Sequence, residues 1–182
     1  SFSKSVVIIS IFYPPIIVAT FRYAKLISGS VWRLIDSSMQ IELMRRNIEN
    51  DVANHSPYKY KLPLTLYVLL LSFVVYFTIR FLQEKGVLFT KFDDLSVFFI
   101  LSSPWLFFAV YNYKSIASLQ FKDQMKYLIF SVFISSGLYL ILAVIGGSIS
   151  EISLPISYST SMAAYFLLAT YFNSRVKRYE RI

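Results

Sequence analysis

An uncharged apolar run near the carboxyl end is the feature that most limits what this chain can fold into. Residues 127–147, YLIFSVFISSGLYLILAVIGG, contain no charged side chain. As a helix rising about 1.5 Å per residue, they would cover roughly 30 Å, which is the thickness of the hydrocarbon core of a bilayer. A second uncharged run, residues 152–173, follows after a short link. We therefore expect a transmembrane helical hairpin.

Basic residues indicate how this hairpin is oriented. Lys122 and Lys126 precede it and further basic residues follow from Arg175 onward, whereas the link between the helices carries only Glu151. The positive-inside rule then places both open ends, and the carboxyl terminus, in the cytoplasm. We interpret the net charge of +8 as a signal of orientation, and we expect no nucleic-acid partner. Of the 18 Lys and Arg residues, the layout leaves four outside, namely Lys4, Arg80, Lys85 and Lys91.

The composition, 56% hydrophobic and 15% charged, predicts a single multipass membrane domain over residues 1–182. Two more apolar runs are long enough to cross a bilayer. They are residues 62–82, whose one charged side chain, Arg80, stands at the far end and can snorkel outward, and residues 95–113, which carry no charge. Pro104 should bend the second of these runs by freeing the carbonyl of Ile100. The predicted fold class is an all-α membrane protein: a helical bundle of four transmembrane helices, a kinked N-terminal fifth and one cytoplasmic amphipathic helix.

The N-terminal segment, about residues 5–27, is the least regular of the apolar runs. Pro14 and Pro15 stand in its middle, so a helix spanning the membrane here should be strongly kinked. Arg22 and Lys25 would extend it to sufficient length by snorkelling to the interface. The alternative is a re-entrant or interfacial segment.

A mixed composition begins after Ser28-Gly29-Ser30, which we expect to interrupt the helical pattern. The periodicity over about residues 31–53 predicts a cytoplasmic amphipathic helix. Two readings stay open: the helix packs on the inner ends of the spans or in the headgroups with Trp32 as an anchor, or it is a docking surface for a partner protein. Its apolar docking stripe consists of Val31, Leu34, Ile35, Ile41, Met44, Ile48 and Val52.

Small and hydroxyl-bearing residues share one face of each helix of the hairpin. In lipid, such residues promote helix association through close approach and interhelical hydrogen bonds. We expect these residues to pack within the hairpin or to form a seam between subunits of a homo-oligomer. The alternative is that they line a polar pore. The residues are Ser131, Ser135, Ser153, Ser157, Thr160, Ser161 and Ala164.

The sequence lacks the residue combinations that metal binding, cofactor binding and catalysis usually require. There is no cysteine, and the one histidine, His55, stands in a loop beside a proline, so we expect neither a metal site nor a cofactor. Asp93 and Asp94 are adjacent at the start of a span, where capping explains them. No nucleophile is accompanied by a base, and we therefore expect no enzyme and no catalytic residues.

These features favour a non-enzymatic protein of the bacterial inner membrane. The expected role is that of a subunit, a sensor, or an interaction component of an immunity, exclusion or phage-defence system that binds a partner protein through its spans or its amphipathic helix. This expectation rests on architecture and on no motif. The alternative is a homo-oligomeric channel or transport component with a path lined by Ser and Thr.

Overall fold

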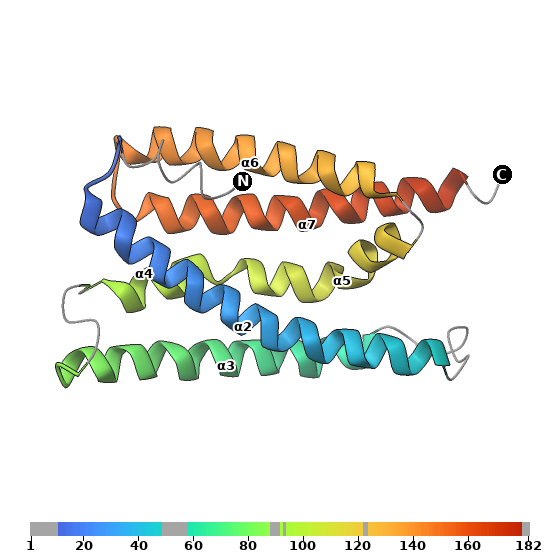
Figure 1. Ribbon diagram of the computed structural model, residues 1–182, viewed down its shortest axis with the longest axis horizontal. Coiled ribbons are helices and arrows are strands. Elements are labelled where there is room, and N and C mark those ends of the chain that lie inside the picture. Colours follow the sequence, from blue (N-terminus) through green and yellow to red (C-terminus); the bar gives the residue numbers. More distant parts are fainter. Residues whose placement is uncertain (1–10, 49–57, 88–91, 93, 122–123, 180–182) are drawn as a thin grey trace.

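Helices make up the whole fold in the computed structural model, which describes residues 11–48, 58–87, 92, 94–121 and 124–179. Helices α3, α6 and α7 run along the long axis of the molecule, and α2 crosses the bundle diagonally (Figure 1). This confirms the all-α class. The helices are α2 (Pro15–Ile48), α3 (Tyr58–Glu84), α4 (Leu95–Ser102), α5 (Trp105–Phe121), α6 (Met125–Gly147) and α7 (Ser153–Tyr179).

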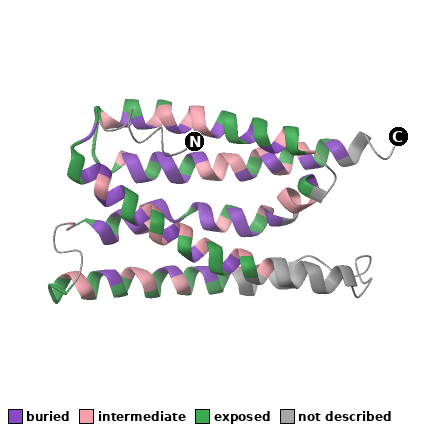
Figure 2. Ribbon diagram, viewed as in Figure 1, coloured by how far each residue is buried: buried purple, intermediate pink, exposed green. Residues whose placement is uncertain are grey.

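Three stretches of the described helices are long and apolar enough to cross a membrane. They are Thr65–Glu84 in α3, Leu95–Tyr113 across α4 and α5, and Met125–Gly147 in α6. The bundle buries 56% of the window in the second stretch, but only 17% of that in α3 and 28% of that in α6. Figure 2 shows the exposed positions along both outer helices. The exposed side chains of α3 and α6 are mostly large and apolar, as lipid-facing side chains are.

Helix α7 covers the predicted span 152–173 but is not among these three. It packs most extensively against α6 and next against α5. A helix enclosed in this way contacts other helices on several sides, so it can carry small and polar residues where a lipid-facing helix needs large apolar ones. Its buried side chains accordingly include Ser157, Ser159, Ser161 and Asn173.

The proline pair does not kink a helix in the described part of the N-terminal segment, contrary to expectation. Helix α2 begins at Pro15, where a missing N–H costs nothing because the first turn has no acceptor for it. The carbonyl of Pro14 accepts from the amides of Ile17 and Val18 at 3.0 and 3.2 Å. Residues 5–10 lie outside the described part of the chain.

Ser28-Gly29-Ser30 does not interrupt the helix either, so the separate amphipathic helix predicted over 31–53 is instead a continuation of α2 as far as Ile48. The Ser28 hydroxyl donates to the Lys25 carbonyl and the Ser30 hydroxyl to the Leu26 carbonyl, each at 3.0 Å. Both hydroxyls therefore find hydrogen-bond acceptors within α2, and the helix continues through this segment.

Pro104 divides the third apolar run into α4 and α5, as its position predicts. The Ser102 and Ser103 hydroxyls both donate to the Phe99 carbonyl, at 3.0 and 2.6 Å, and the Ser103 amide reaches the Ile100 carbonyl at 3.4 Å. The break therefore leaves these carbonyls satisfied in an apolar interior. Asp94 takes the N-cap position of α4, but its side chain makes no capping hydrogen bond.

Candidate functional site

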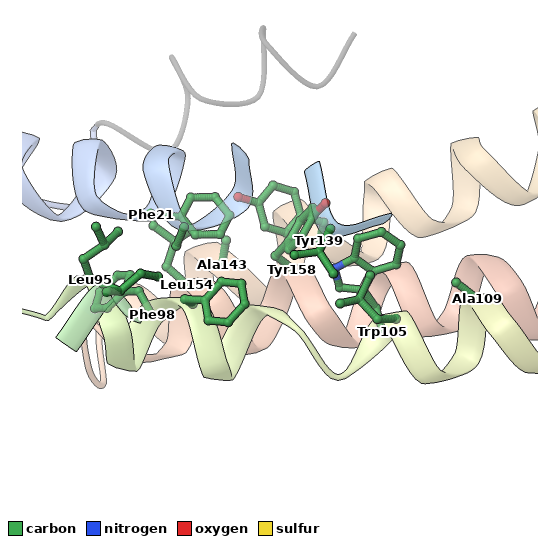
Figure 3. Packing of buried hydrophobic residues seen from close by; sticks show 14 of the residues in the cluster. Phe21, Leu95, Phe98, Trp105, Ala109, Tyr139, Ala143, Leu154 and Tyr158 are labelled. Atoms are coloured by element: carbon green, nitrogen blue, oxygen red, sulfur yellow. The ribbon is translucent and has the colours of Figure 1, made fainter. Parts of the chain in front are cut away.

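An aromatic core forms where α2, α5, α6 and α7 meet (Figure 3). We use this name for Phe21, Trp105, Tyr139, Tyr158 and Phe166, all 5% exposed or less. The Tyr158 ring makes edge-to-face contacts with the rings of Phe21 and Tyr139 at 5.6 and 6.1 Å between centroids. Such geometry is the favoured one for aromatic pairs. The core therefore connects four helices through one central tyrosine.

Tryptophans extend the aromatic core toward the middle of α2. The Trp105 ring stacks on Phe166 at 6.0 Å and lies 6.4 Å from the Tyr158 ring. Trp32, on α2, packs 5.7 Å from Trp105. Nε1 of Trp105 is buried and has no hydrogen-bond partner among the described residues. Leaving a buried donor without an acceptor costs free energy, so Nε1 of Trp105 is a destabilising feature of the core.

Lys25 lies beside this core, a position that the sequence analysis did not predict. Its side chain is partly buried, and its Nζ lies 5.2 Å from the centroid of the Tyr158 ring. This is a cation–π contact, which gains strength where water is excluded. Arg22, three residues earlier on α2, is exposed. The structure thus places a lysine of α2 against the aromatic core, whereas the sequence analysis expected the charges of this segment at the membrane interface.

Four serines of the predicted hairpin face lie inside the bundle. Ser131, Ser135, Ser157 and Ser161 are 5% exposed or less. Their hydroxyls donate to carbonyls of their own helices, namely those of Tyr127, Val132, Ser153 and Tyr158, at 2.7–3.1 Å. They therefore act as small residues that let α6 and α7 approach, and these four hydrogen bonds stay within the helix that carries each serine. Ser153 and Ala164 are partly buried, and Thr160 is exposed.

The hydrogen bonds described between helices involve Tyr13, Asn112 and Thr170, which the sequence analysis did not single out, together with Ser153, which it did. The Tyr13 hydroxyl, just before α2, donates to the Ala143 carbonyl of α6 at 2.8 Å and shares a second hydrogen bond of 2.8 Å with the Ser153 hydroxyl of α7. The Thr170 hydroxyl of α7 donates to Oδ1 of Asn112 on α5 at 2.6 Å. Asparagine in an otherwise apolar run is the signal that could have revealed the second bond.

Thr170→Val tests whether this second bond stabilises the bundle. We expect a loss of about 0.6 kcal/mol and at most about 1.7, because the Asn112 oxygen loses its donor while the side-chain shape is kept. The measurement is unfolding in mixed micelles, followed by circular dichroism. Thr78→Val is the matched control, since the Thr78 hydroxyl donates only to the Val74 carbonyl of its own helix. Equal effects of the two variants would contradict the interhelical role.

The predicted docking stripe divides between two environments. Val31 and Ile35 are 4% and 1% exposed and belong to this chain's own core, so a partner cannot contact them, whereas Leu34 is 61% exposed. One face of α2 therefore serves folding in this region. Of the other stripe residues, Ile41, Met44 and Ile48 lie where the structure describes only the backbone, and Val52 lies outside the described residues.

The described residues hold no group of three or more His, Cys, Asp or Glu side chains that could bind a metal ion. His55 lies outside them. Comparisons of the chain with models of protein families, with curated proteins and with solved structures gave no match. The site must therefore be interpreted from its own geometry.

Proposed function

We propose that this chain is a non-enzymatic multipass membrane protein that acts by binding a partner protein within the membrane. Its role would be that of a subunit, a sensor, or an immunity, exclusion or phage-defence component in the bacterial inner membrane. We also propose that α2 and α7 cross the bilayer with the three apolar stretches and that the carboxyl terminus is cytoplasmic. The distribution of Lys and Arg supports this orientation.

The observation that carries the proposal is the loose attachment of α3. Among the described residues, this helix packs less extensively against α4, α5 and α2 than α6 and α7 pack against each other. Between residues 65 and 84, where its side chains are described, the buried ones are Val68, Ser72 and Ile79. The described stretch Thr65–Glu84 therefore has most of its surface available for another transmembrane helix.

The free side of α3 has a shape that suits a partner helix. Phe73, Phe77 and Phe81 recur every four residues and are 52–61% exposed. They line a shallow groove together with Leu70, Val74 and Thr78. Helices in lipid associate through van der Waals packing, so a ridged aromatic surface with one hydroxyl is better suited to a specific helix than to fluid acyl chains. We assign this groove to a transmembrane helix of the partner.

Phe73→Ala combined with Phe77→Ala tests this assignment. We expect normal insertion and folding but loss of most of the partner that co-purifies in mild detergent, because the groove loses two of its walls. Phe130→Ala with Phe133→Ala is the matched control, since these rings on α6 are at least as exposed, at 53% and 78%. The proposal fails if both pairs retain the partner, or if both lose it equally.

Site-specific photo-crosslinking separates a protein neighbour from lipid without removing side chains. A photoreactive phenylalanine analogue at position 77 should give a protein adduct, and the same analogue at position 133 should label lipid. An adduct with a second copy of this chain would identify the partner as a homo-oligomer. Lipid labelling at both positions would contradict the proposal.

The channel alternative draws less support from the described residues. A pore lined by residues 153–161 needs hydroxyls that face water, but Ser157 and Ser161 are 5% and 1% exposed and donate to their own helix. Of the four Ser and Thr residues between 157 and 161, Thr160 is exposed and Ser157, Ser159 and Ser161 are buried. We therefore favour partner binding over conduction.

A further inference from the structure

We infer that the helix bound in the α3 groove is α3 of a second copy of this chain, related to the first copy by a two-fold axis. The inference rests on the proposed assignment of the groove to a partner helix and adds which helix occupies it. It starts from the shape of the groove and from the two charges at one end of α3.

Two rows of side chains form the walls of the groove, and the rows differ in height. Each row follows the four-residue spacing of neighbours along a helix surface, and all its side chains are exposed. The tall row is Phe73, Phe77 and Phe81, and the lower row is Leu70, Val74 and Thr78. A ridge of three rings therefore lies beside a groove that is open to another ridge.

A surface with one ridge beside one groove is complementary to itself. When a two-fold axis along the membrane normal relates two copies, the phenylalanine row of each α3 lies in the groove of the other. Such packing of four-residue ridges into four-residue grooves gives crossing angles near −50° in soluble proteins and about −40° in membranes. Copies of one chain insert in the same orientation, so the two α3 helices are parallel, as this symmetry requires. Two-fold dimers are also the commonest symmetric oligomers.

The position of α3 in the bundle leaves room for this contact. The helix lies at the edge of the molecule (Figure 1). Between residues 65 and 84 its buried side chains are Val68, Ser72 and Ile79. With 3.6 residues per turn, these lie roughly 160° around α3 from the phenylalanine row. The groove therefore faces away from the rest of its own chain.

Two charged residues continue the groove face and match the same symmetry. Arg80 and Glu84 follow Phe73 and Phe77 by seven residues each, about two turns, so they lie on the same side of α3. Their side chains are 58% and 63% exposed. A two-fold axis brings the cation of each copy toward the anion of the other, whereas a face with charges of one sign would repel its own copy. The face is therefore self-complementary in charge as well as in shape.

The contact between copies does not require either charged group to lose its hydrogen bonds within α3. A guanidinium has five N–H donors. Arg80 donates to Oε1 of Glu84 at 3.0 Å and to the Tyr76 hydroxyl at 3.4 Å. Its further donors and the second carboxylate oxygen of Glu84 can bond across the axis. The two copies then share four charges of alternating sign.

Charge reversal at these two positions tests the symmetry. Two copies with different affinity tags would be co-expressed, and recovery of one tag with the other would be measured in mild detergent. When both copies carry Arg80→Glu, or both carry Glu84→Arg, recovery should fall about 10-fold below that of the parent chain, because four like charges meet at the axis. A copy with Arg80→Glu should pair with a copy with Glu84→Arg at about the parent level.

Arg22→Glu is the matched control, because Arg22 is an exposed cation on α2, away from the groove face. It should leave recovery unchanged when both copies carry it. Circular dichroism of each purified variant verifies that the helices are formed. Parent-level recovery between two Arg80→Glu copies, or no recovery of the mixed pair when both variants are folded, would overturn the two-fold arrangement.

Photo-crosslinking separates failure of this inference from failure of the groove assignment. The photoreactive phenylalanine analogue at position 77 should give an adduct within residues 70–81 of a second copy, located by mass spectrometry after digestion. An adduct with a different protein would overturn the second copy and leave the groove assigned to a partner helix. An adduct with another helix of a second copy would overturn the contact of α3 with α3. Lipid labelling at position 77 would overturn both the inference and the groove assignment.

Discussion

Gly146→Ala is expected to destabilise the bundle by about 1–3 kcal/mol, the usual cost of overfilling a packed interface. A β-carbon at this position would lie 2.5 Å from both Cβ and Oγ of Ser153, and 3.7 Å from the Tyr13 hydroxyl. A Cβ atom cannot rotate away, so α6 and α7 would have to separate where the Tyr13 hydroxyl connects them. The free energy of unfolding, measured in mixed micelles, tests this expectation.

Gly137→Ala is the matched control on the same helix, because a β-carbon there meets nothing within 4 Å. It should stabilise the protein by up to about 1 kcal/mol through the lower backbone entropy of alanine in the unfolded chain. Ser153→Gly should partly rescue Gly146→Ala, whereas Ser153→Ala should not, since alanine keeps the clashing Cβ. Equal effects of the two glycine substitutions would contradict the close approach of α6 and α7.

The strongly apolar part of the fold is predictable because one physical requirement dominates it. The thickness of the bilayer and the near absence of charge, with Arg80 as the one charged side chain, identify residues 62–82, 95–113 and 127–147 without knowledge of any neighbour. Pro104 is equally predictable, since its ring blocks a local backbone hydrogen bond. These features depend on interactions between residues that are close in the sequence and on the contact of each segment with lipid.

Helix α2 was misjudged because its course depends on tertiary contacts. Ser28 looks like a helix breaker by propensity, yet it is fully buried and bonds to its own backbone. Val31 and Ile35 form a stripe that predicts one buried face, but periodicity does not say whether the cover is lipid, a partner or the same chain. The contact of Lys25 with Tyr158 joins residues too distant in sequence for any local pattern to indicate.

The candidate serine face was found from the sequence, but its use could not be deduced there. A serine spacing of three or four residues serves close packing, an oligomer seam and a pore equally well. What separates these uses is exposure in the folded chain. Ser157 and Ser161 are buried and Thr160 is not, so substitutions at these positions have opposite expected effects.

Ser157→Leu with Ser161→Leu should prevent recovery of the folded protein. Each larger side chain would be forced between packed helices at about 1–3 kcal/mol per site, roughly 2–6 in total. Ser157→Ala with Ser161→Ala should cost less than about 1 kcal/mol, because each lost hydroxyl bonds only to its own helix. Thr160→Leu is the control on the exposed side of α7 and should fold normally.

A water-filled path along these serines predicts the reverse order of effects. The alanine pair would then fold but reduce ion flux in liposomes, and the leucine pair would fold and block it. Thermal unfolding and flux measured on the same reconstituted variants separate the two cases. We expect the leucine pair to fail at folding and the alanine pair to leave the bilayer as tight as the parent chain does, because hydroxyls that point into a helix interface contact neither water nor ions.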